Sequence, residues 1–277
     1  MTTRGMAWIG SPDRLSTCTI CLAGAPLGEA LEVIADAGFR KIDLLGRMPH
    51  FSIDPAEFDV GELERHCARL GLHVAGIGSY FGKDLRKESG ADAVEAEVKA
   101  AGRGIEIAAR LGARVIRVGV GDRAHETAFA LVPFLTEVAR LADRHGIRVG
   151  VETHGGITSD PQGMAELCGR VGCGNFGVIY DPCNLLADGV DYRRAYEELR
   201  RHVVHVHLKD GRRNESGRRL THFGEGEIDM AWILKQLDAD GYDGEVALEY
   251  EIGKVESPRT GLVKWRQRYE QLVATLA

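Results

Sequence analysis

Four apolar stretches in the second half of the sequence each end on a side chain that can bind a metal ion. They contain the sequences IRVGVETHGG, FGVIYDPCN, VVHVHLKDG and EVALEYE, and their terminal ligands are Glu152, Asp181, His207 and Glu249. Three carboxylates and one imidazole at successive strand ends predict one divalent-metal site. Oxygen-rich ligation with one imidazole suits Mn²⁺, our first expectation, as well as Mg²⁺ or Co²⁺, with Zn²⁺ as an alternative.

The alternation of side chains along a strand indicates which of these residues share a face. Glu152 lies on the same face as His154, opposite a row of branched apolar residues. In VVHVHLK, the shared polar face carries His205, His207 and Lys209. Buried charges at this density are too costly unless they are paired or bound to a metal. We therefore expect the polar faces to point into the interior or the mouth of a barrel.

Each of these assignments has a plainer alternative. His207 lies nearer the mouth than His205, so it is the better ligand, and His205 would fill the barrel or support the ligand. His154 at the rim could contact a substrate, or it could be a surface histidine. Lys209 could polarise a substrate oxygen, or it could extend its ammonium group to solvent. Some of the four strand-end ligands could likewise be solvated charges.

Arginine is concentrated in the segment that follows the strand containing His207. Arg212, Arg213, Arg218 and Arg219 all lie within it. Guanidinium groups above a metal site could hold a phosphate or a carboxylate. A solvated, flexible loop would have the same composition, and the sequence does not choose between the two.

Short apolar runs alternate with helical segments along the whole chain, which is typical of parallel α/β architecture. We expect strands near 16–22, 40–45, 72–78, 114–120, 147–153, 176–181, 203–209 and 245–250. We expect helices near 27–38, 57–70, 91–111, 124–146, 160–172, 190–201, 228–240 and 260–275. Glycine follows several helices just before the next strand, as C-terminal caps do. These eight units predict a single (β/α)8 TIM barrel as one domain over residues 1–277, with the active site at the carboxyl ends of the strands.

Length and composition agree with this fold. A chain of 277 residues with a net charge of −6 is of barrel size, and it lacks the basic excess of a general nucleic-acid surface. No run of apolar residues is long enough for a membrane span, and the N-terminus lacks a signal-peptide core, so we expect a cytoplasmic protein without a membrane partner. The six cysteines are expected to be reduced thiols, including the pair Cys18 and Cys21. A homo-oligomer is compatible with the sequence.

The motifs VETHGG, YDPCN, HVHLKD, GEGEID and LEYE, with PLGEALEVIADAGFRKIDLLG near the N-terminus, resemble the xylose-isomerase-like TIM barrels. Within them the chain is similar to the sugar phosphate isomerases and epimerases, which include ketose 3-epimerases, hydroxypyruvate isomerase and inosose dehydratase. The resemblance implies that Glu152, Asp181, His207 and Glu249 hold the metal. It also implies that Glu152 and Glu249 act as the catalytic acid and base.

The sequence departs from the ketose-epimerase pattern at positions that would contact the sugar. Thr158 stands where those enzymes carry a further glutamate, and Asn184 stands where they carry a histidine. An arginine is kept as Arg213. With His154 and Lys209, Asn184 and Arg213 complete the predicted substrate-binding set.

The chemistry expected of this site is proton abstraction next to a carbonyl group. The substrate would be a small polyhydroxylated carbonyl compound, such as a sugar or sugar phosphate, and the metal would stabilise the enediolate. Return of the proton makes the enzyme an isomerase or epimerase. Loss of a β-hydroxyl makes it instead a dehydratase of an inosose-like or dehydroshikimate-like substrate. A non-catalytic sugar-binding barrel is the alternative from a different class of protein.

Overall fold

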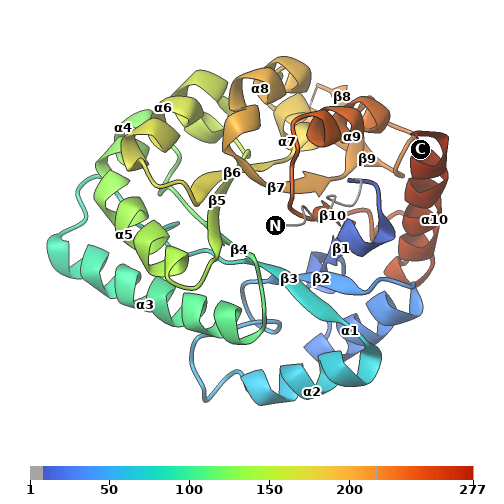
Figure 1. Cartoon of the computed structure of the whole chain (residues 1–277), viewed down its shortest axis with the longest axis horizontal. Helices are drawn as coiled ribbons and strands as arrows, with labels where there is room; N and C mark the ends of the chain where they lie inside the picture. Colours follow the sequence, from blue (N-terminus) through green and yellow to red (C-terminus); the bar gives the residue numbers. More distant parts are fainter. Residues whose placement is uncertain (1–8, 216, 277) are drawn as a thin grey trace, which may run out of the picture.

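The structure, a computed structural model that describes residues 9–215 and 217–276, contains a closed barrel of parallel strands surrounded by helices (Figure 1). The strands follow one another around the barrel in the order β1-β10-β7-β6-β5-β4-β3-β2. Their bounds are β1 Leu15–Cys18, β2 Lys41–Leu45, β3 His73–Gly78, β4 Val115–Val118, β5 Arg148–Glu152, β6 Phe176–Tyr180, β7 Val203–Leu208 and β10 Val246–Leu248. The predicted (β/α)8 barrel is confirmed.

The helices form an outer ring around the strands, and α10 packs beside α1, where the last helix meets the first (Figure 1). Their bounds are α1 Leu27–Asp36, α2 Val60–Leu70, α3 Ala91–Arg110, α4 His125–Ala130, α5 Val132–Asp143, α6 Pro161–Val171, α7 Pro182–Ala187, α8 Tyr192–Leu199, α9 Met230–Ala239 and α10 Pro258–Leu276. Short 3₁₀ turns lie at Pro12–Arg14, Thr19–Leu22, Gly156–Ser159 and Arg200–His202.

Helix α2 shows how the local sequence sets these elements. The side chain of Asp59 accepts a hydrogen bond from the backbone N–H of Gly61 and so satisfies a free donor of the first turn. Leu63 and Cys67, four residues apart on one face, are buried against the barrel. Gly71 then ends the helix with φ 65, a left-handed conformation that glycine adopts without a steric cost. The chain is thereby directed into β3.

Strand β5 shows how the two faces of the barrel wall differ. Val149 and Val151 point outward and are completely or almost completely buried beneath the helices. Gly150 points inward, and a Cβ there would lie 2.5 Å from Cγ1 of Ile179. Because the barrel interior is already filled at this level, the glycine is required. Glu152, two residues after Gly150 and on the same inward face, reaches the carboxyl end of the barrel.

Three predicted elements differ from the structure. The first strand is shorter than 16–22, because the chain turns into a 3₁₀ helix after Cys18. The helix expected over 124–146 is two helices divided at Leu131, just before the proline-containing first turn of α5. The segment 210–227, expected as an irregular connection, contains a hairpin of β8 Asp210–Asn214 and β9 Gly217–Thr221.

No helix within residues 9–215 and 217–276 combines the length and apolar character that a membrane crossing requires. The six cysteines all lie within these residues and are free, as expected.

Candidate metal centre and substrate cavity

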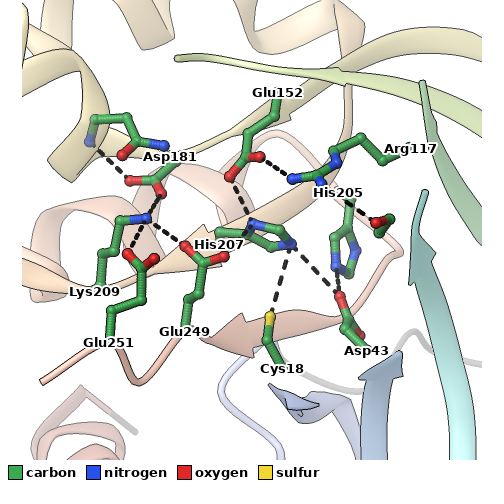
Figure 2. A network of polar contacts seen from close by, with 12 residues as sticks. Cys18, Asp43, Arg117, Glu152, Asp181, His205, His207, Lys209, Glu249 and Glu251 are labelled. Carbon is green, nitrogen blue, oxygen red and sulfur yellow. Dashed lines mark hydrogen bonds and ion pairs between the residues drawn. The ribbon is translucent and has the colours of Figure 1, made fainter. Parts of the chain in front are cut away.

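The four predicted ligands come together at the carboxyl end of the barrel (Figure 2). Glu152 is the last residue of β5, Asp181 directly follows β6, His207 lies in β7 and Glu249 directly follows β10. One potential ligand atom from each of these residues lies within 4.8 Å of every other. Because adjacent parallel strands end side by side, residues from four distant segments converge on one point.

The chemistry of this cluster fits a divalent metal ion. Oδ1 of Asp181 accepts hydrogen bonds from the backbone N–H groups of Cys183 and Asn184, whereas the buried Oδ2 faces the ammonium group of Lys209 at 3.0 Å. Nδ1 of His207 lies 3.1 Å from Oε1 of Glu152 and 3.8 Å from Oε1 of Glu249, so one ring nitrogen faces the carboxylates. Three carboxylates and one imidazole are a donor set suited to Mn²⁺, Mg²⁺ or Co²⁺.

The other nitrogen of His207 faces a second polar group that the sequence analysis did not find. Its Nε2 lies 3.6 Å from Oδ2 of Asp43 on β2 and 4.0 Å from Sγ of Cys18. Asp43 is buried and is also bonded by Nε2 of His205 at 2.5 Å and by the hydroxyl of Ser16 at 3.0 Å. A carboxylate behind a ligand histidine holds its ring in position. His205 therefore lies behind the cluster of potential ligands, whereas His207 belongs to it.

A lysine contacts the carboxylates from the other side. Nζ of Lys209 lies 3.0 Å from Oδ2 of Asp181 and 2.8 Å from Oε2 of Glu251, and it donates a hydrogen bond to Glu249 (Figure 2). The side chain of Lys209 is only 3% exposed. The alternative in which this lysine extends to solvent is therefore wrong. Burial lowers its pKa, but the attraction of the carboxylates outweighs burial and holds the pKa well above its ordinary value.

Arg117 on β4 is a further residue that the sequence analysis missed. Its guanidinium donates a hydrogen bond of 2.5 Å to Oε2 of Glu152 and lies over the ring of Tyr80, 4.6 Å from its centre. It also donates to the backbone carbonyls of Gly78 and Ser79. These contacts fix the direction in which Glu152 points. The only signal in the sequence was one arginine at an inward position of an otherwise apolar strand.

The two carboxylates at neighbouring strand ends have pKa values shifted in opposite directions. Burial raises the pKa of Glu152, but Arg117 and then His207 outweigh it and hold the pKa well below the ordinary value. Burial also raises the pKa of Asp181, and the attraction of Lys209 offsets this only in part, so the pKa lies above its ordinary value. Glu152 is thus held as the carboxylate at neutral pH.

A cavity of about 350 Å³ opens beside the cluster and is large enough for a small sugar-sized molecule. Glu152, Glu249 and Lys209 line it, together with His154 and Thr158 from the segment after β5. A second space, of about 30 Å³, lies behind His207 next to Asp43 and His205, and it has room for little more than one water molecule. Of these two spaces next to the cluster, the larger one has the room for a substrate.

The predicted substrate-binding residues are divided by the structure. His154 and Lys209 line the larger cavity. Asn184 is buried in α7 with its side-chain amide atoms unbonded, and it is not among the cavity's lining residues. Arg213 is exposed on β8, and its guanidinium packs against Gly189 instead of lining the cavity.

Among the four clustered arginines, Arg218 lies nearest the carboxylates around Lys209. Arg218 lies 3.8 Å from Oε2 of Glu251, which itself contacts Lys209. In the hairpin register, Arg212 is opposite Arg219 and Arg213 is opposite Arg218. The four arginines therefore lie on the two paired strands of the β8–β9 hairpin.

The sequence model of the family described as "Xylose isomerase-like TIM barrel" matches residues 31–274. The chain belongs to this family.

The sequence identity to individual proteins is low. A 3-dehydroshikimate dehydratase from Pseudomonas aeruginosa is 27% identical over an alignment of 248 residues, covering 84% of this chain but only 37% of that protein. A putative hydroxypyruvate isomerase from Streptomyces coelicolor is 26% identical over 268 residues, covering 89% of this chain and 92% of that protein. The crystal structure of a D-tagatose 3-epimerase-like protein superposes with a TM-score of 0.77 at 18% identity, covering 95% of this chain and 98% of that one.

Proposed function

We propose that this protein is a divalent-metal-dependent isomerase or epimerase of a small polyhydroxylated carbonyl compound, a sugar or a sugar phosphate. One observation carries the proposal: two glutamates, Glu152 and Glu249, belong to the same buried cluster of potential ligands and both line the substrate-sized cavity. A protein that only binds a sugar has no need for both. The family match and the similarity to a putative hydroxypyruvate isomerase support the same class of reaction.

Glu152, Asp181, His207 and Glu249 would hold the metal, and Mn²⁺ or Mg²⁺ suits this set. When bound, such an ion supplies positive charge beside the substrate oxygen on which negative charge develops. The other requirements are a base and an acid, which Glu152 and Glu249 would provide.

Glu152 is suited to take the proton from the carbon next to the carbonyl. Arg117 and His207 keep it ionised, and Arg117 fixes one of its oxygens so that the carboxylate keeps one orientation. Glu249, approached by Lys209, would carry the proton on the second side of the substrate. Return of a proton to the opposite face of the same carbon gives epimerisation, and return to the neighbouring carbon gives isomerisation. Lys209 would bind a substrate oxygen by exchanging one of the three carboxylates that its ammonium group contacts.

Hydrogen exchange with solvent tests this proposal. Protein incubated with Mn²⁺ or Mg²⁺ in D₂O and a panel of ketoses, inososes and their phosphates should introduce deuterium next to the carbonyl group, measured by NMR. We expect Glu152→Gln and Glu249→Gln to reduce the rate at least about a hundredfold. Glu198→Gln, which alters an exposed glutamate of α8, should leave it unchanged. Absence of exchange across the panel would favour a non-catalytic, sugar-binding barrel.

The second candidate is a dehydratase that uses the same proton abstraction and then expels a β-hydroxyl group as water. The observation that favours it is the similarity to a 3-dehydroshikimate dehydratase over 84% of this chain. Dehydroshikimate and an inosose are the substrates to include for it. Formation of a dehydrated product, followed by its ultraviolet absorbance and by mass spectrometry, would support the lyase over the isomerase.

A further inference from the structure

The cavity next to the candidate metal centre is lined by basic side chains as well as by the three glutamates Glu152, Glu249 and Glu251. Its lining includes four basic side chains, Lys83, Arg117, Arg123 and Lys209, although the chain has a net charge of −6. Arg117 and Lys209 are paired with carboxylates of the site. Lys83 and Arg123 are not: within residues 9–215 and 217–276, no carboxylate lies within 4.0 Å of either of them. Two cations thus line the cavity without a carboxylate partner among the described residues.

The backbone that carries Lys83 is fixed against the neighbouring segment. The N–H of Gly119 donates to the carbonyl of Phe81 at 2.7 Å, and the N–H of Gly121 donates to Gly82 at 3.1 Å. A Cβ at Gly119 would lie 2.8 Å from Cα of Lys83, so only glycine permits this approach. The segments after β3 and β4 are therefore held together as one wall. The ammonium group of Lys83 lies 5.6 Å from the centre of the Tyr80 ring on the same wall.

Arg123 has a backbone conformation that arginine rarely adopts. Its φ is 65, and it is the non-glycine residue with positive φ among residues 9–215 and 217–276. The segment after β5 holds Arg123 in this conformation, because the N–H of Ile157 donates a hydrogen bond to the backbone carbonyl of Arg123 at 2.8 Å. Glycine would adopt this conformation without cost. Strained residues of this kind occur at ligand clamps, which suggests that the side chain of Arg123 is required for binding.

We infer that the substrate of this site carries an anionic group, a carboxylate or a phosphate, which Lys83 and Arg123 bind while the carbonyl end faces Glu152 and Glu249. The inference rests on the proposed function and specifies its substrate class. A guanidinium binds both oxyanions through paired N–H groups, and an ammonium group adds a mobile point charge. The glutamates would repel the same anion, so the two kinds of lining residue orient the substrate along the cavity. Uncharged sugars would lack this orientation.

Two variants test the inference without disrupting the fold. Arg123→Gly removes the guanidinium and relieves the strained φ, and Lys83→Met removes the ammonium while keeping the length of the side chain. Arg103→Met, an exposed arginine of the outer helix α3, is the matched control for loss of one positive charge. Inorganic phosphate and malonate are titrated into the full chain by isothermal calorimetry without added metal. We expect each site variant to weaken both probes about tenfold and Arg103→Met to leave them unchanged.

The same variants are then compared in the deuterium-exchange assay with fructose, fructose 6-phosphate, hydroxypyruvate and 3-dehydroshikimate. We expect an increase in KM of about tenfold or more for the charged substrates that are used, and no change for fructose. Preference for fructose 6-phosphate identifies a phosphate, and preference for the other two identifies a carboxylate. Unchanged probe affinity in both variants overturns the inference, and so does a change in KM that is the same for charged and uncharged substrates. In either case, deuterium exchange itself still supports the proposed function. Probe binding lost in the variants, without exchange on any substrate, supports the anion site and overturns the proposed function.

Discussion

Replacing Lys209 with methionine should make the stability of this protein depend on an added divalent metal ion. The ammonium group is buried and contacts Asp181, Glu249 and Glu251, of which the first two are themselves buried. Methionine keeps much of the volume but leaves carboxylates in the interior without this cation. Breaking a buried ion pair by removing one partner costs about 3–5 kcal/mol. At roughly 2–4 °C per kcal/mol for a chain of this size, Tm in EDTA should fall by about 6–20 °C.

A divalent ion should restore most of this loss, because it supplies positive charge to the same carboxylates. We therefore expect the rise in Tm on adding Mn²⁺ or Mg²⁺ to be larger in Lys209→Met than in the unaltered protein. Differential scanning calorimetry in EDTA and in metal measures both values, with Lys235→Met, an exposed lysine of α9, as the control. Equal Tm values for Lys209→Met and the unaltered protein in EDTA would refute this account of the buried charges.

Two further predictions concern the barrel interior. Burial raises the pKa of Asp43, but His205 outweighs it and holds the pKa below its ordinary value, so the stabilisation is complete above about pH 4 and is lost as pH falls below that. Asp43→Asn should lower the free energy of unfolding by about 3 kcal/mol at pH 7 and flatten the loss of stability between about pH 4 and pH 2. Urea unfolding at each pH measures both effects, and the exposed control Asp36→Asn should show neither. Gly177→Ala should cost about 2–3 kcal/mol, because its Cβ would lie 2.0 Å from the backbone oxygen of His202 and 2.7 Å from Cγ1 of Val204. Gly174→Ala has open space and should be almost neutral, so equal urea midpoints for the two variants would contradict this.

The barrel and the convergence of four potential metal ligands could be predicted because both depend on local patterns. The order helix, glycine, strand repeats along the chain, and the alternation of inward and outward residues assigns Glu152 and His207 to one face. Parallel strands in a barrel end side by side, so residues far apart in the sequence could be placed together. The same reasoning selected His207 over His205, and the structure places the latter on Asp43 instead.

The partners behind these ligands could not be predicted, because they depend on contacts across the barrel. Asp43 and Arg117 are single charged residues in apolar strands, and nothing local indicates that one lies behind His207 and the other on Glu152. The hairpin of β8 and β9 was missed for a different reason. Its arginines lack the alternation of apolar and polar residues that indicates a strand.

The most direct test of the central claim is the stoichiometry and affinity of Mn²⁺ binding, measured by calorimetry on protein first treated with EDTA. The four strand-end ligands predict one ion per chain, with binding at least about a hundredfold weaker in Asp181→Ala and in His207→Ala. His154→Ala, which removes a histidine that lines the cavity outside the cluster, should bind the ion as the unaltered protein does. Mn²⁺ affinity unchanged by both Asp181→Ala and His207→Ala would contradict the account.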